Sequence, residues 1–129
     1  MAGWIVVFFV LAVIGWAVVQ RLGWIKIPDA AAKLRSGAIL VDVRTPSEYR
    51  MSKVDGAYNV PLGEFSQTVE TKGWSKDQQI VVYCASGNRS RAAIRQLTAL
   101  GYPHVWNLGT VGRARQAAAE LGGQDRATP

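Results

Sequence analysis

The sequence is poor in cysteine and histidine and contains one of each, Cys84 and His104. A single cysteine excludes a disulfide within the chain. One cysteine and one distant histidine do not make the ligand set of a structural zinc site. We therefore expect a reducing environment, and we predict neither a metal nor another cofactor.

The N-terminal segment lacks charged side chains, and the first charged residue of the chain is Arg21. The formal net charge of +6 therefore belongs entirely to the part of the chain that follows. This part has no long block of consecutive cations, and its basic and aromatic residues do not interleave. We interpret the charge as a solvated basic surface and predict no nucleic-acid partner.

The uncharged N-terminal run, Ala2–Val19, is long enough for a membrane-spanning helix. Trp4 and Trp24 bracket it, and in a helix rising about 1.5 Å per residue they lie about 30 Å apart, the thickness of the hydrocarbon core. We therefore expect both tryptophans at the membrane interfaces. A cleaved secretory signal would need a basic start, a shorter apolar run and a small-x-small cleavage site, and a buried core helix is the other alternative.

Cations such as Arg21 and Lys26 follow the apolar run, so the positive-inside rule places the rest of the chain in the cytoplasm. We predict a single-pass anchor of the inner membrane, residues 1–22, with the N-terminus outside. The run lacks the paired small residues of close-packed helix dimers, so we expect a monomer.

Beyond the anchor, short apolar runs alternate with stretches of helical periodicity. This alternation is typical of an α/β fold with a small, mostly parallel sheet and helices on both faces. We expect one domain over residues 23–122 and a polar C-terminal tail over residues 123–129. The expected strands are residues 38–43, 56–61, 79–84 and 105–108, and the expected helices are residues 28–37, 46–51, 62–71, 90–100 and 113–121.

The residues around Cys84 have the pattern of a reactive cysteine. The apolar strand 79–84 ends on this cysteine, a loop containing Gly87 follows, and a helix begins near Ser90, which we expect to cap it. Loop and helix N–H groups converging on one point favour an anion, and a nearby arginine adds to the effect. Such surroundings convert a thiol into a nucleophilic thiolate. The alternative, an inert buried thiol, does not account for these flanking residues.

Two motifs resemble the rhodanese family in its single-domain form. The loop motif C-x-x-G-x-R-S and the signature D-V-R-x-x-x-E-Y followed by G-A-x-N-x-P-L both occur, and the resemblance covers residues 25–121. The matching residues are Cys84, Gly87, Arg89 and Ser90 in the loop, and Asp42, Val43, Arg44, Glu48, Tyr49, Gly56, Ala57, Asn59, Pro61 and Leu62 in the signature.

The resemblance implies a sulfurtransferase that moves a sulfane sulfur from a small anionic donor such as thiosulfate to a thiol acceptor through a persulfide. The catalytic residues it implies are Cys84 and Arg89. The persulfide-binding loop it implies is Ala85, Ser86, Gly87, Asn88 and Ser90, supported by Asp42, Arg44 and Arg91.

Two other functions remain open. The phosphatases and arsenate reductases that this family resembles have a C-x5-R loop, one residue longer, which a tetrahedral oxyanion needs. A non-catalytic rhodanese-like binding module at the membrane is the second alternative. From helical spacing, Arg44 and Glu48 are predicted to form a structural ion pair, and His104 is predicted to be a surface residue.

Overall fold

The computed structural model describes the backbone of residues 2–127 and the side chains of residues 2–19 and 23–122. Four strands form one parallel sheet in the order β2-β1-β3-β4. The strands are β1 (Ile39–Asp42), β2 (Ala57–Asn59), β3 (Ile80–Cys84) and β4 (Val105–Thr110). The predicted α/β class and the parallel sheet are therefore confirmed.

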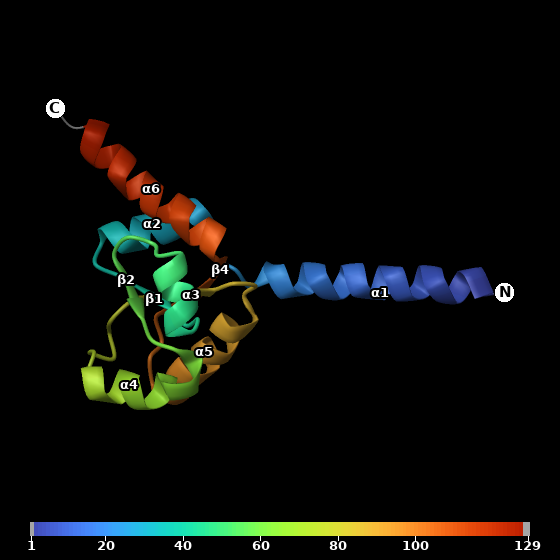
Figure 1. The fold of residues 1–129 in the computed structure, drawn as a ribbon, viewed down its shortest axis with the longest axis horizontal. Coiled ribbons are helices and arrows are strands. Elements are labelled where there is room, and N and C mark those ends of the chain that lie inside the picture. Colours follow the sequence, from blue (N-terminus) through green and yellow to red (C-terminus); the bar gives the residue numbers. More distant parts are fainter. Residues whose placement is uncertain (1, 128–129) are drawn as a thin grey trace.

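Both faces of the sheet are covered by helices (Figure 1). The helices α2 (Ile27–Arg35) and α6 (Val111–Ala127) pack on one face, and α4 (Phe65–Lys72) and α5 (Asn88–Ala99) pack on the other. Alternate residues of β3 enter the two cores, with Val81 and Tyr83 beneath α2 and α6. Burial on both faces explains why this strand is an uninterrupted apolar run.

Local signals set the ends of the shorter elements. The hydroxyl of Thr45 accepts from the Glu48 backbone N–H and the Glu48 carboxylate accepts from Thr45 N–H, a capping box that begins α3 (Pro46–Met51). A short 3-10 helix, η1 (Leu62–Glu64), precedes α4. These segments lie where the sequence predicted helices.

The N-terminal helix α1 (Ala2–Leu22) projects away from the globular part (Figure 1). Its window Ala2–Val19 has a mean hydropathy of 2.6, and none of the window is buried against the rest of the protein. By length and composition, α1 is able to cross a membrane.

Several predicted boundaries differ from the structure, most clearly in the last two helices. The helix after the loop begins at Asn88 and not near Ser90, because Gly87 at positive φ already turns the chain into it. The last helix, α6, continues to Ala127, so most of the segment predicted as a tail is helical. Residues 128 and 129 of that predicted tail lie outside the described residues.

Candidate active site

Cys84 is the last residue of β3, and its fully buried side chain belongs to the core beneath α4 and α5. A short loop connects it to the first residue of α5, Asn88. Ala85, Ser86 and Asn88 are exposed. The loop is therefore at the surface, at the carboxyl end of a central parallel strand, where α/β folds bind their ligands.

Backbone N–H groups point at the sulfur. The N–H of Gly87 donates to Cys84 Sγ at 3.0 Å and that of Ser90 at 3.4 Å. Gly87 has a φ of 90°, in the left-handed region that glycine adopts without strain. These donors come from the loop and from the first turn of α5, so the predicted convergence of amides on Cys84 is present.

Ser90 lies inside α5 and does not cap it, because the N-cap position is Gly87. The expected cap is therefore wrong. Its hydroxyl is buried and has three neighbours: Asn107 Oδ1 at 2.7 Å, the Gly87 carbonyl at 3.0 Å and Cys84 Sγ at 3.5 Å. Ser90 thus supports the sulfur with its side chain as well as its backbone.

Asn107 on β4 is a buried residue that the sequence did not single out. Its Oδ1 accepts from the Gly109 N–H at 2.9 Å, and its Nδ2 donates to the Gly87 carbonyl at 3.2 Å. A donor on one side and an acceptor on the other fix which way the amide faces. The one available signal was a polar residue within an apolar strand.

The pKa of the Cys84 thiol is set by opposing effects. Burial raises it, while the Ser90 hydroxyl and the backbone N–H groups of Ser90, Ser86 and Gly87 lower it. The hydrogen bonds outweigh burial, and the pKa lies below its ordinary value. The site therefore favours a thiolate, the form in which cysteine is a nucleophile.

Arg89, on the first turn of α5, forms a two-pronged ion pair with Glu48 of α3. Its Nη1 and Nη2 donate to Glu48 Oε1 and Oε2 at 2.7 and 3.0 Å. Hydrogen bonding from Arg89 holds the pKa of Glu48 down at about 2, despite the opposing effect of burial. The predicted Arg44–Glu48 pair is therefore wrong, because Glu48 turns toward the loop.

Arg44 pairs with Asp42 at the end of β1. Its Nη2 donates to Asp42 Oδ2 and to the Ser52 carbonyl, both at 2.8 Å, and both side chains of the pair are buried. These contacts tie β1 to the end of α3. They give Asp42 and Arg44 a supporting role in the architecture around the loop.

Arg91 is half-buried, and its backbone N–H donates to the Gly87 carbonyl at 3.1 Å. Its side chain lines a cavity of about 380 Å³ together with Trp24 and Asn107. Arg91 therefore lies beside the loop, on the side that faces the end of α1.

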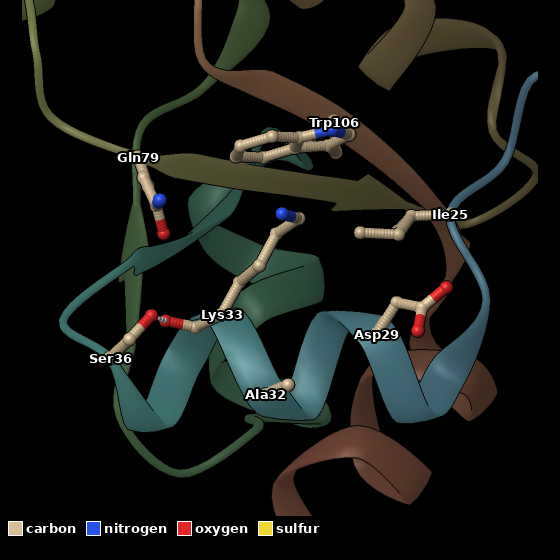
Figure 2. Close-up of a pocket in the computed structure, with 7 residues that line it drawn as sticks. All are labelled: Ile25, Asp29, Ala32, Lys33, Ser36, Gln79 and Trp106. Carbon is tan, nitrogen blue, oxygen red and sulfur yellow. Dashed lines mark hydrogen bonds between the residues drawn. The ribbon is translucent and has the colours of Figure 1, made fainter.

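A second cavity, of about 430 Å³, lies beside α2 (Figure 2). Lys33 points across it, with its Nζ 3.9 Å from the centre of the Trp106 ring. Its lining includes Gln79, which precedes β3, whereas Cys84 ends that strand. This cavity is therefore separate from the thiol site. The exposed His104 stacks on Trp106, consistent with its predicted surface position.

Comparison with known proteins gives one family. Residues 27–110 match the family described as "Rhodanese-like domain". The matched range begins with α2 and ends with β4, so it contains the whole sheet, the Cys84 loop and both sequence motifs. The N-terminal helix α1 lies outside it.

Among curated relatives, a thiosulfate sulfurtransferase of Escherichia coli, PspE, is 39% identical over 69 residues, 54% of this chain and 66% of that protein. A putative mitochondrial thiosulfate sulfurtransferase of Schizosaccharomyces pombe is 36% identical over 80 residues, 54% of this chain and 56% of that protein. The chain therefore spans less than two thirds of the length of either. A solved structure described as "rhodanese with anions from E. coli" is 36% identical, with a TM-score of 0.56, and covers 59% of this chain and 89% of that one.

Proposed function

The chain belongs to the rhodanese-like family, and on that premise we propose that it is a sulfurtransferase that carries a sulfane sulfur on Cys84. The observation that carries the proposal is the pair of N–H groups, from Gly87 and Ser90, that donate to the Cys84 sulfur. They lower the pKa of the thiol and are placed to stabilise the charge of a persulfide. The relatives named thiosulfate sulfurtransferases support the same reaction class.

In the first step, the Cys84 thiolate attacks the sulfane sulfur of a donor such as thiosulfate. A new S–S bond forms to Cys84, the S–S bond of thiosulfate breaks, and sulfite leaves with the electron pair. In the second step, the thiolate of an acceptor attacks the outer sulfur of the persulfide, and the Cys84 thiolate is released. Charge and electrons balance without an added oxidant, and a covalent intermediate gives ping-pong kinetics.

The loop residues have separate parts in this proposal. The backbone of Ala85, Ser86, Gly87 and Asn88, continuing to Ser90, surrounds the transferred sulfur. Arg89 supplies positive charge for the anionic donor. The loop is one residue shorter than the phosphatase loop, which favours one added sulfur atom over a tetrahedral oxyanion. Within this chain there is no second cysteine, so the acceptor thiol belongs to another molecule.

Intact mass spectrometry tests this function. The full chain, incubated with thiosulfate, is expected to gain the mass of one sulfur atom, and a thiol acceptor is expected to remove it. The Cys84→Ser variant is the matched control and should gain nothing. If thiosulfate and other sulfane donors leave the wild-type mass unchanged, the protein is a binding module and not a sulfurtransferase.

We also propose that α1 anchors the protein, with residues 23–122 as a monomeric domain on the cytoplasmic side of the inner membrane. The support is the apolar, unburied window Ala2–Val19 and the cations that follow it. Sequencing the N-terminus of the mature protein tests the anchor. A start in the low twenties would identify α1 as a cleaved signal.

A further inference from the structure

Trp24 is separated from α1 by a single residue, yet it joins the globular domain. Its backbone forms a parallel bridge with Asn107, and the N–H of Ile25 donates to the Asn107 carbonyl at 2.9 Å. The chain leaving α1 therefore pairs with β4 at the residue whose side chain holds Gly87 and Ser90. The predicted interface position of Trp24 gave no hint of this contact.

The indole of Trp24 fills a space that two glycines leave open. A Cβ at Gly87 would lie 2.5 Å from Trp24 Cζ2, and a Cβ at Gly109 would lie 2.7 Å from Trp24 Cδ2 and Cε3. Both distances are too short for any side chain, so the ring lies directly against the backbone of both glycines. Gly87 belongs to the loop and Gly109 to β4, so one aromatic ring spans the two segments that build the site.

The ring is itself held in place. The guanidinium of Arg113 lies 5.4 Å from the centre of the indole, within the range of a cation–π contact. Arg113 also donates to the carbonyls of Leu108 and Ile25, which connects α6 to β4 and to the segment after α1. The indole therefore has support from Arg113 as well as from the two glycines.

The contact of Trp24 with Gly87 matters because both backbone polar groups of Gly87 are hydrogen-bonded at the active site. Its N–H donates to Cys84 Sγ, and its carbonyl accepts from Ser90 and Asn107. Glycine is the residue with the greatest backbone freedom, so the direction of this N–H depends on what packs against it. The wide, rigid surface of a tryptophan restricts that freedom.

We propose that Trp24 is a positioning residue for the sulfur-carrying loop, which deepens the sulfurtransferase function proposed above and rests on it. Its indole holds Gly87 so that the backbone N–H stays directed at the Cys84 sulfur. The segment that leaves the membrane helix is thereby part of the active-site architecture. A tryptophan that served only as a membrane-interface anchor would not affect the chemistry of Cys84.

The test compares full-length variants in detergent. Trp24→Ala removes the ring, Trp24→Phe keeps an aromatic ring too narrow to span both glycines, and Trp4→Ala removes the tryptophan at the other end of α1. The first readout is the rate of Cys84 alkylation by iodoacetamide against pH, which reports the thiol pKa. The second is kcat and KM for sulfur transfer from thiosulfate to a thiol.

Trp24→Ala is expected to raise the Cys84 pKa by about one unit, the scale of one hydrogen bond to a charged group. At pH values below the Cys84 pKa of both proteins it should lower kcat about tenfold, since about ten times fewer molecules carry the thiolate. Trp24→Phe should fall between Trp24→Ala and the wild type, and Trp4→Ala should match the wild type. If Trp24→Ala has the alkylation profile and kcat of Trp4→Ala, the proposal is overturned.

If Trp24→Ala does not fold, Trp24→Leu replaces it in the same measurement, because leucine retains apolar bulk without contacting both glycines. A raised Cys84 pKa in a folded Trp24→Leu protein supports the proposal, and an unchanged pKa overturns it. The alkylation profile needs no sulfur transfer. Failure of the wild type to form a persulfide would therefore reject the sulfurtransferase function while the role of Trp24 is still measured.

Discussion

At Cys84, burial and hydrogen bonding act in opposite directions on one sulfur atom. Burial disfavours the thiolate, and N–H donors with a nearby hydroxyl favour it. The Ser90 hydroxyl carries one proton but lies near two acceptors, Asn107 Oδ1 and the Gly87 carbonyl, while its oxygen accepts from the Cys84 thiol. When the thiol loses its proton, the Ser90 hydroxyl is able to turn toward the negative sulfur.

Ser90→Ala should therefore raise the pKa of Cys84 by about one unit, because a hydrogen bond to a charged group is lost. The sign follows from the native state, where this hydroxyl lowers the pKa. The pH dependence of iodoacetamide alkylation measures the change. Ser47→Ala, at an exposed position on α3, is the control and should leave the profile unchanged. An unaltered profile in Ser90→Ala would assign the lowered pKa to the backbone amides alone.

Two short elements, α3 and the first turn of α5, meet through one carboxylate. Glu48 completes the capping box of α3 with Thr45 and also binds the guanidinium of Arg89. Both side chains of the ion pair are about one third exposed, so its contribution to stability is small, about 0–1 kcal/mol. Its larger consequence is electrostatic, because the negative charge of Glu48 lies against Arg89, the arginine proposed to attract the anionic sulfur donor.

Glu48→Gln should lower KM for thiosulfate about fivefold, because it removes a competing negative charge equivalent to roughly 1 kcal/mol at an exposed site. Glutamine still fits the capping box, so α3 should keep its start. Steady-state kinetics with varied thiosulfate measures the effect.

Thr45→Ala is the matched control, since it weakens the cap by about 1 kcal/mol and leaves the carboxylate in place. It should lower the melting temperature without lowering KM. A higher KM in Glu48→Gln would mean that Glu48 orients Arg89 for the donor and does not compete with it.

For the whole molecule, the short connection between α1 and the domain limits how far the loop can lie from a membrane. From Val19 to Leu22 the helix rises about 4.5 Å, and the next two residues extend at most about 7 Å. If α1 spans a membrane as proposed, with Val19 at the hydrocarbon edge, Trp24, which contacts Gly87, lies within about 12 Å of that edge, close to the headgroup layer of about 5–7 Å. This limit holds at any angle between α1 and the domain.

With α1 in a bilayer, the Cys84 loop should accept small reagents more readily than bulky ones. In vesicles, alkylation by a maleimide carrying a long polyethylene glycol chain should be slowed relative to N-ethylmaleimide. A flexible insertion of about twelve Gly and Ser residues between Leu22 and Gly23 adds a reach of roughly 20 Å. The insertion keeps Trp24 in place and should restore the rate of the bulky reagent. Equal rate ratios with and without the insertion would contradict a loop held at the membrane surface.

The sequence by itself determined the elements that local patterns control. Local sequence patterns predicted all four strands, and the apolar run 79–84 placed Cys84 at a strand end. Gly87 and the arginine that follows identified the loop, because a turn at positive φ and a helix start are encoded by neighbouring residues. Boundaries were predicted less well, because α5 begins before its predicted range and α6 extends beyond its range at both ends.

Only the tertiary structure decided which distant side chains meet at Cys84. Glu48 reaches Arg89 across 41 positions and Asn107 reaches Ser90 across 17, where helical spacing had suggested Arg44 as the partner of Glu48. Trp24 packs on Gly87 and Gly109, although its place beside an apolar run predicted a membrane interface. Such contacts depend on how the sheet brings β1, β3 and β4 together, and packing across strands selects partners that no local pattern records.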